Sequence, residues 1–164
     1  RGTFDLSSHE KASGKDMSYF DPETNEKITP TVIEPAGGLT RTLFALLCSC
    51  YDEEEVNDTT RTLFRFDFNI APIQIGILPL SKKDELIKVS NNIKNILQEN
   101  YRTEIDVTQS IGKRYRRQDE IGTPYCITVD FDSLDDNSVT VRNRDTMKQE
   151  RVAIIDLLGF FSDI

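Results

Sequence analysis

The residues with the clearest potential for chemistry in this chain are a carboxylate and a guanidinium on either side of two glycines. The sequence runs Val32-Ile33-Glu34-Pro35-Ala36-Gly37-Gly38-Leu39-Thr40-Arg41 and then enters an apolar stretch at residues 42–47. This pattern predicts a short strand, a glycine-containing turn, and a helix with Arg41 in its first turn. Because a ligand can approach the backbone closely at glycine, Glu34 and Arg41 would flank a site for a molecule with an ammonium group at one end and phosphates at the other.

A second group of charged residues is basic and falls in the C-terminal half. Lys113, Arg114, Arg116 and Arg117 lie within five positions, and Arg142 follows in a later predicted strand. The net charge of −8 argues against general affinity for nucleic acid, so a nucleic-acid surface would have to be local to these residues. The alternative is that the basic run is only the solvated face of a helix.

Four blocks, in order along the chain, carry a resemblance to a known family. They are Arg1 to Leu6 with His9, Val32 to Arg41, Ser110 to Pro124, and Val139 to Met147. The second block resembles motif 3 of the class II aminoacyl-tRNA synthetases, in the form found in homodimeric, bacterial-type glycyl-tRNA synthetases. The third resembles the signature of that family's anticodon-binding domain. The first and fourth are similar to segments that precede motif 3 and follow the signature, so the resemblance covers nearly the whole chain.

The resemblance implies part of a glycine–tRNA ligase, which activates glycine with ATP and passes it to tRNA(Gly). It implies ATP as a substrate, accompanied by Mg²⁺, and glycine and tRNA(Gly) as partners. It also implies a homodimer for the full-length protein and a cytoplasmic location. Regions resembling motifs 1 and 2 are absent from this sequence, so we expect the fragment alone to be inactive. The alternative is a non-catalytic module, derived from a class II synthetase, that binds tRNA or another partner.

The resemblance also implies roles for single positions. Glycine is expected to contact Glu34, Pro35, Ala36, Gly37 and Gly38; ATP is expected to contact Gly38, Leu39, Thr40 and Arg41; tRNA is expected to contact Lys113, Arg114, Arg116, Arg117 and Arg142. Arg41, which matches the arginine that reaches the adenine and the γ-phosphate, is the expected catalytic residue. The alternative for Arg41 is a surface arginine at the start of a helix. The alternative for Glu34 is a carboxylate at the end of a strand that pairs with a neighbouring backbone or basic group. Ala36 and Thr40 depart from the family, which has serine at the first position and aspartate or glycine at the second.

Cysteine and histidine give no support to a metal site. The chain has 3 cysteines, an odd number that does not form a disulfide framework. Cys48 and Cys50 are two apart on a predicted helix, so their side chains point in different directions. His9 is the single histidine, and a structural or surface role is favoured over catalysis. We therefore predict no metal ligands in this chain.

The elements that would position motif 3 lie in residues 1–69, predicted to be the C-terminal part of a class II catalytic domain with an antiparallel sheet. The expected elements are a hairpin around residues 19–28, a strand at 31–34, a helix at about 39–51, and a surface loop at 57–60. The apolar stripe of the helix is expected to be core. It comprises Leu39, Leu43, Phe44, Leu46 and Leu47. The acidic run 52–55 is interpreted as a solvated helix end or loop.

Residues 70–164 are predicted to form the anticodon-binding domain, with an α/β fold and a mixed, partly parallel sheet. Strands are expected at residues 73–80, 104–107, 125–131, 138–142 and 150–152, and helices at 81–97, 110–120 and 154–161. Ser81 is expected to cap the first of these helices, with Asp84 as its capping-box partner. The prolines that bound the first strand, and its β-branched composition, predict that it is buried.

Overall fold

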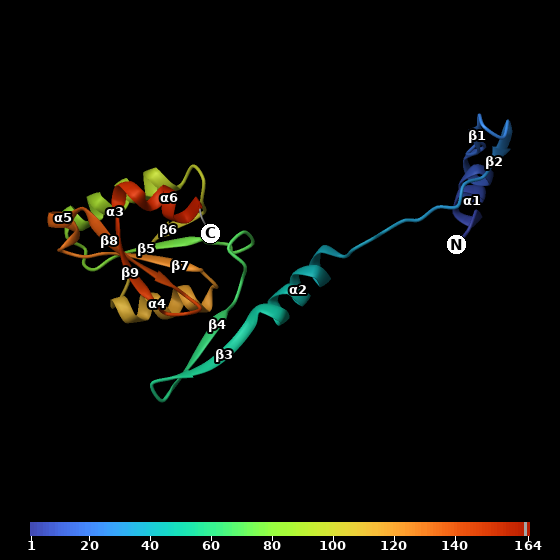
Figure 1. The fold of residues 1–164 in the computed structure, drawn as a ribbon. Coiled ribbons are helices and arrows are strands. Elements are labelled where there is room, and N and C mark those ends of the chain that lie inside the picture. Colours follow the sequence, from blue (N-terminus) through green and yellow to red (C-terminus); the bar gives the residue numbers. More distant parts are fainter. Residues whose placement is uncertain (163) are drawn as a thin grey trace. The chain divides into compact units, whose positions relative to one another are not determined.

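The computed structural model describes residues 1–162 and 164, and it divides into two compact units (Figure 1). The N-terminal unit comprises residues 1–42 and the C-terminal unit residues 43–164. In the described part of the chain, no helix combines the length and the hydrophobicity that crossing a membrane requires. The domain division expected between residues 69 and 70 stays a prediction.

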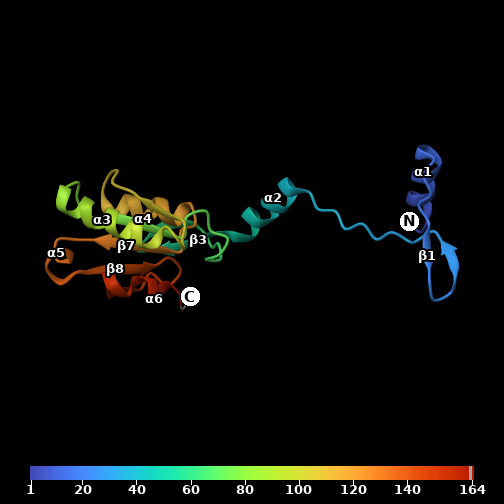
Figure 2. The ribbon, with the colours of Figure 1, turned by 90° about the horizontal axis from the view of Figure 1, so that it is seen from above.

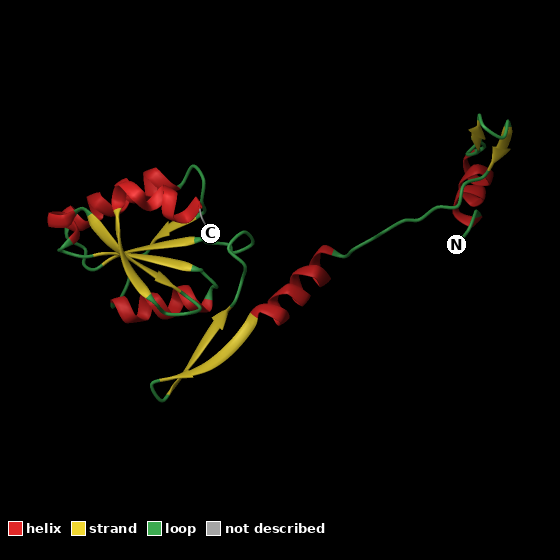
Figure 3. Ribbon diagram, viewed as in Figure 1, coloured by secondary structure: helices red, strands yellow, loops and turns green. Residues whose placement is uncertain are grey.

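The N-terminal unit consists of a helix, a small hairpin and an irregular segment. Helix α1 (Phe4–Ser13) ends at Gly14, whose φ of 66° lets its N–H donate to the carbonyl of Glu10. Strands β1 (Tyr19–Asp21) and β2 (Glu26–Ile28) pair antiparallel, which confirms the predicted hairpin. Residues 29–38 have no regular secondary structure and appear as a loop in Figure 3.

The strand predicted at residues 31–34 is therefore wrong, and backbone pairing explains why. A strand persists when a neighbouring strand takes up its hydrogen bonds. In the described residues, none of the sheets includes this segment. Pro30 and Pro35 border it and have no N–H to contribute to a ladder.

Helix α2 (Leu39–Cys50) confirms the predicted helix but contradicts the predicted burial of its apolar stripe. No residue of α2 is buried, and Leu39 and Phe44 are 84% and 69% exposed. The helical spacing of the apolar residues shows only that one face of α2 is apolar. Burial of that face requires a second element that packs against it. The described residues leave this face largely uncovered.

Residues 51–64 form a second hairpin, which corrects two predictions. Strand β3 (Tyr51–Val56) follows α2 without a linker and pairs antiparallel with β4 (Thr59–Phe64). Asn57 and Asp58 have φ values of 51° and 59°, as a two-residue type I′ turn requires. The acidic run is thus a strand, because Arg61 on β4 and Arg65 just after it pair with its carboxylates. The expected loop is only two residues long.

The C-terminal unit is built around a five-stranded sheet with the order β6-β5-β7-β8-β9. Its strands are β5 (Ile75–Pro79), β6 (Thr103–Ile105), β7 (Tyr125–Val129), β8 (Ser138–Asn143) and β9 (Gln149–Ala153). Strands β6, β5 and β7 run parallel to one another, whereas β8 and β9 join antiparallel. This confirms the predicted α/β class and the mixed sheet. Every residue of the inner strand β5 is buried, as its composition predicts.

Helices cover both faces of this sheet. Helices α3 (Asp84–Leu97) and α6 (Leu157–Ser162) lie on one face and α4 (Ile111–Glu120) on the other (Figure 1); Figure 2 gives the view from above. A short helix, α5 (Ser133–Asp136), lies between β7 and β8, and a 3₁₀ turn, η1 (Ile154–Asp156), precedes α6. Helix α3 buries Leu86, Ser90, Ile93 and Leu97, which follow its helical period.

The start of α3 corrects the predicted cap. The helix begins at Asp84 after Lys83, and no side chain caps it. Ser81 Oγ instead accepts a hydrogen bond from the Lys83 N–H at 3.4 Å. This bond between a serine hydroxyl and the backbone two residues later is an ST-turn, and it lies before the helix. Asp84 occupies the first helical position, where its charge still favours the helix dipole.

Candidate nucleic-acid interface

The residues predicted to bind glycine and ATP lie in the irregular segment and the first turn of α2. Glu34 to Arg41 are all exposed. The glycine turn expected here is not formed: neither Gly37 nor Gly38 has a positive φ, and no heavy atom lies within 4 Å of the position that a Cβ on Gly37 would occupy. The structure therefore leaves Glu34 and Arg41 exposed, and their roles stay predictions.

Helix α4 carries the predicted basic run, and some of these basic side chains are exposed whereas others are buried. Lys113 and Arg116 are exposed, whereas Arg114 is only 3% exposed. One terminal nitrogen of Arg114 donates to the carbonyls of Pro79, at 2.6 Å, and Asp106, at 3.0 Å. Pro79 is the last residue of β5 and Asp106 directly follows β6. The Arg114 side chain therefore connects α4 to the sheet by hydrogen bonds.

Arg117 is held by a carboxylate. Its Nε donates to the Asp106 carboxylate at 3.0 Å, and Asp106 also accepts from the N–H and the hydroxyl of Thr108. Burial alone would raise the pKa of Asp106, but the hydrogen bonds from Thr108 and Arg117 outweigh it and hold that pKa below its usual value. Arg117 is partly exposed, and it is not a free cation.

Arg142 is buried against the same helix. Its guanidinium donates to both carboxylate oxygens of Asp119, at 2.9 and 3.1 Å, and lies 4.9 Å from the centre of the Tyr115 ring. The expectation that Arg114 and Arg142 belong to an exposed tRNA surface is thus corrected: both side chains are part of the fold. Charge and spacing could not reveal this, because the partners come from distant parts of the chain.

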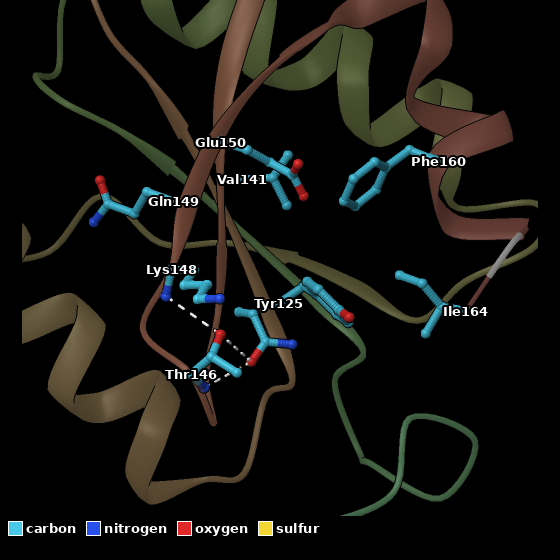
Figure 4. Close-up of a pocket in the computed structure, with 9 residues that line it drawn as sticks. Tyr125, Val141, Thr146, Lys148, Gln149, Glu150, Phe160 and Ile164 are labelled. Carbon is cyan, nitrogen blue, oxygen red and sulfur yellow. Dashed lines mark hydrogen bonds between the residues drawn. The ribbon is translucent and has the colours of Figure 1, made fainter.

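A cavity of about 580 Å³ lies on the other face of the sheet (Figure 4). Successive side chains along a strand point to opposite faces of the sheet. Because Arg142 on β8 points toward α4, the adjacent residues Val141 and Asn143 point to the other face, where they line the cavity. The cavity is lined by Tyr125, Val141, Asn143, Thr146, Lys148, Gln149, Glu150, Phe160 and Ile164. The rings of Tyr125 and Phe160 meet edge to face, with centroids 6.4 Å apart, and give it apolar walls.

Two side chains give this cavity a hydrogen-bonding pattern. Asn143 Oδ1 accepts from the N–H groups of Asp145 and Thr146, each at 2.9 Å, so its amide nitrogen has no partner among the described residues and can act as a donor. Glu150, on the adjacent strand β9, is exposed and supplies acceptors. Aromatic walls beside a donor and an acceptor suit a flat heterocycle that is bound by its face and read along its edge. Sequence reasoning missed this site, since its walls come from separate strands and a helix.

No metal site accompanies these surfaces in the described residues. Among residues 1–162 and 164, no group of three or more histidine, cysteine, aspartate or glutamate side chains is arranged to hold an ion. Cys48 is exposed, Cys50 partly exposed and Cys126 buried. His9 lies exposed on α1.

Comparison with known proteins decides the family. Residues 74–164, which include the sheet, the basic helix and the cavity, match the family model described as "Anticodon binding domain". The chain belongs to the anticodon-binding domain family. Its fold therefore has the architecture of a domain class that recognises tRNA anticodons.

Curated relatives extend the match across the remaining residues. The chain is 54% identical over 164 residues to a protein named glycine–tRNA ligase from Ruminiclostridium cellulolyticum, covering 99% of this chain and 35% of that protein. It is 49% identical over 167 residues to the protein of the same name from Streptomyces coelicolor, covering 99% and 36%. These matches confirm the resemblance to glycyl-tRNA synthetases. The chain spans about a third of the length of the curated relatives it matches.

Solved structures share the anticodon-binding fold at lower identity. A prolyl-tRNA synthetase from Cryptosporidium parvum, complexed with halofuginone and AMPPNP, superposes with a TM-score of 0.57 and 24% identity, over 62% of this chain and 22% of that one. The RNA-binding domain of a threonyl-tRNA synthetase from Cryptosporidium parvum Iowa II gives 0.55 and 22%, over 60% and 25%. At this identity the likeness concerns the fold alone.

Proposed function

We propose that this chain is part of a glycine–tRNA ligase and that its C-terminal unit binds the anticodon of tRNA(Gly). The family match and the glycine–tRNA ligase relatives support this proposal. The observation that carries it is the cavity beside Tyr125 and Phe160, because unpaired RNA bases are bound by stacking on aromatic side chains and by hydrogen bonds to their edges.

The polar groups of the cavity fit cytosine better than uracil. The Glu150 carboxylate accepts from the exocyclic amine of cytosine, and the Asn143 amide donates to a ring acceptor. Uracil places a carbonyl oxygen where cytosine has the amine, which would oppose the carboxylate. Every glycine codon begins with two guanines, so the anticodon that pairs with it carries two cytosines.

Phosphate contacts are assigned to the exposed cations of α4. Lys113 and Arg116 are exposed, whereas Arg114 is buried. They lie on the face opposite the cavity, so we expect them to contact the RNA backbone rather than the base in the cavity. Their contribution should weaken as the salt concentration rises.

The test is a titration of labelled tRNA(Gly) into the full chain and two variants. Glu150→Ala should weaken binding about tenfold or more, since one base-edge contact is worth roughly 1–3 kcal/mol. Glu104→Ala is the matched control, because Glu104 is an exposed carboxylate on β6, the edge strand opposite β9 in the sheet. Removing a negative charge should otherwise favour RNA binding, so equal or tighter binding by Glu150→Ala would contradict the proposal.

The motif 3 residues are assigned to glycine activation in the full-length protein. We propose that Glu34 faces the ammonium of glycine, with Pro35 to Gly38 around it, and that Gly38, Leu39, Thr40 and Arg41 contact ATP, which enters with Mg²⁺. Arg41 is exposed and available to a phosphate. The homodimer and the cytoplasmic location belong to the same proposal.

Activation is tested by glycine-dependent pyrophosphate exchange. This chain alone should show none, and in the full-length protein Arg41→Ala should slow activation on the order of 10²–10³-fold. Arg41→Lys should recover little, because lysine offers a point charge and no planar surface. Lys11→Ala, an exposed cation on α1, is the control. Full-length protein that binds tRNA without any exchange would favour the non-catalytic alternative, to which the departures at Ala36 and Thr40 point.

A further inference from the structure

We propose that Asp119 is a positioning residue that locks the β3–β4 hairpin onto the anticodon-binding fold. Asp119 lies on α4, and its side chain is only 4% exposed. From the hairpin, Arg61 of β4 donates through Nε to the Asp119 carboxylate at 2.8 Å, and the Arg61 side chain is 8% exposed. The contact joins residues 58 positions apart in the sequence.

The same carboxylate is bound from the sheet. Arg142 of β8 donates to both of its oxygens. Arg61 also donates to the carbonyl of Arg144, at 2.7 Å, and pairs with Glu54 across the hairpin. At the buried centre, the Asp119 carboxylate is shared by the guanidiniums of Arg61 and Arg142, whereas Glu54 is partly exposed and also pairs with Arg65. A buried group of paired charges favours one arrangement of the elements that contribute to it.

Apolar packing follows the polar contacts along the hairpin. Leu63 faces the same side of β4 as Arg61 and is fully buried. At the end of the strand, the ring of its last residue, Phe64, stacks with the ring of Phe66, with centroids 5.2 Å apart. Phe66 in turn lies against Gly122, at the end of α4. The hairpin is thus a docked layer of the C-terminal unit and not a free connector.

Docking the hairpin has a consequence for the preceding helix. Because β3 begins at the residue after α2, the lock holds the chain directly behind that helix. Residues 43–50 of α2 accordingly belong to the C-terminal unit. The lock therefore acts within the unit that we propose binds tRNA, on the hairpin that directly follows α2.

Hydrogen exchange on the full chain tests the lock. Asp119→Asn would leave Arg142 buried without its charge partner and could unfold the whole unit. Arg61→Met is the decisive variant, because the Asp119–Arg142 pair stays intact within the sheet. Amides of residues 51–64 should then exchange on the order of 100-fold faster, while β5 and β7 exchange as in the unmodified chain. Arg151→Met is the matched control, since Arg151 also pairs with two carboxylates, Asp130 and Asp136, but outside the hairpin.

Each outcome of the exchange experiment decides the matter. Selective loss of protection in the hairpin supports the lock. Unchanged protection in Arg61→Met, or equal loss in the hairpin and in β5, would overturn it. So would a hairpin that exchanges as fast as an unfolded chain before any substitution.

A kinetic experiment tests the positioning role, which rests on the proposed function. In the full-length ligase, Arg61→Met should leave glycine-dependent pyrophosphate exchange within about twofold and lower kcat/KM for tRNA(Gly) roughly tenfold. A minihelix that carries only the acceptor stem should lose nothing, because it never reaches the anticodon-binding unit. Equal losses with both RNAs would refute the positioning role. Absence of pyrophosphate exchange in the unmodified full-length protein would instead refute the proposed function, and the hydrogen-exchange result would stand.

Discussion

Replacing Arg114 by methionine separates a structural arginine from an RNA-binding one. Methionine keeps an unbranched apolar stem and removes the guanidinium that donates to the Pro79 and Asp106 carbonyls at 2.6 and 3.0 Å. A third contact, to Leu80 at 3.5 Å, is long. The substitution should therefore destabilise the fold without changing the exposed charge of α4.

The magnitude follows from two opposing effects. Two buried hydrogen bonds from a charged donor are each worth roughly 1.5–3 kcal/mol. Against this, burial lowers the pKa of Arg114, which shows that the charge is desolvated, and its Nε has no partner in the described residues. Both costs disappear in the variant. We therefore expect a net loss of about 2–3 kcal/mol in the free energy of unfolding.

Urea unfolding of the full chain, followed by far-UV circular dichroism, measures this loss. With a slope of about 1–3 kcal/mol per molar urea, the midpoint should fall by roughly 0.7–3 M. Arg116→Met is the matched control and should stay within about 0.5 kcal/mol, because Arg116 is exposed. The reasoning is refuted if Arg114→Met unfolds like the unmodified chain but binds tRNA(Gly) more weakly, since Arg114 would then act at the RNA surface.

Three further predictions concern single residues. Gly122→Ala should cost about 2–4 kcal/mol of stability, because φ is 82° there and a Cβ would come within 2.3 Å of the Phe66 ring; an unchanged melting temperature would contradict this. Burial raises the pKa of Cys126 to about 12, so iodoacetamide at pH 8 should label Cys48 and spare Cys126 in the native chain, and native labelling of Cys126 would show that the thiol is accessible. The pKa of Asp106 is lowered on folding, so its ionic contribution is present above the unfolded value near 3.8 and is lost as the pH falls. Asp106→Asn should therefore destabilise the chain more at pH 6 than at pH 2.5 in urea titrations, and an equal effect at both values would be inconsistent with that shift.

The sequence was sufficient to predict the elements whose pattern is local. The run from Ile75 to Pro79 is apolar and bordered by proline, and it forms the buried inner strand. The helical period of Leu86, Ile93 and Leu97 marks the buried face of α3. In both cases the signal lies within one element and needs no knowledge of its partner.

Features that depend on distant partners were not predictable in this way. The acidic residues of β3 look like a solvated loop until Arg61 and Arg65 are known to face them. Arg114 and Arg142 look like surface charges until the carbonyls and the carboxylate that bind them are located. The cavity was missed for the same reason, since Tyr125 and Phe160 meet only in the folded chain.

The central claim is that the C-terminal unit reads the anticodon of tRNA(Gly), and tRNA substitution tests it most directly. The unmodified chain is titrated with tRNA(Gly), with forms in which either anticodon cytosine is replaced by uracil, and with a form that has one altered acceptor-stem pair. We predict that at least one uracil form binds about tenfold or more weakly, while the acceptor-stem form binds like unmodified tRNA(Gly). Equal affinity for all four RNAs, at matched salt concentration, would contradict the account.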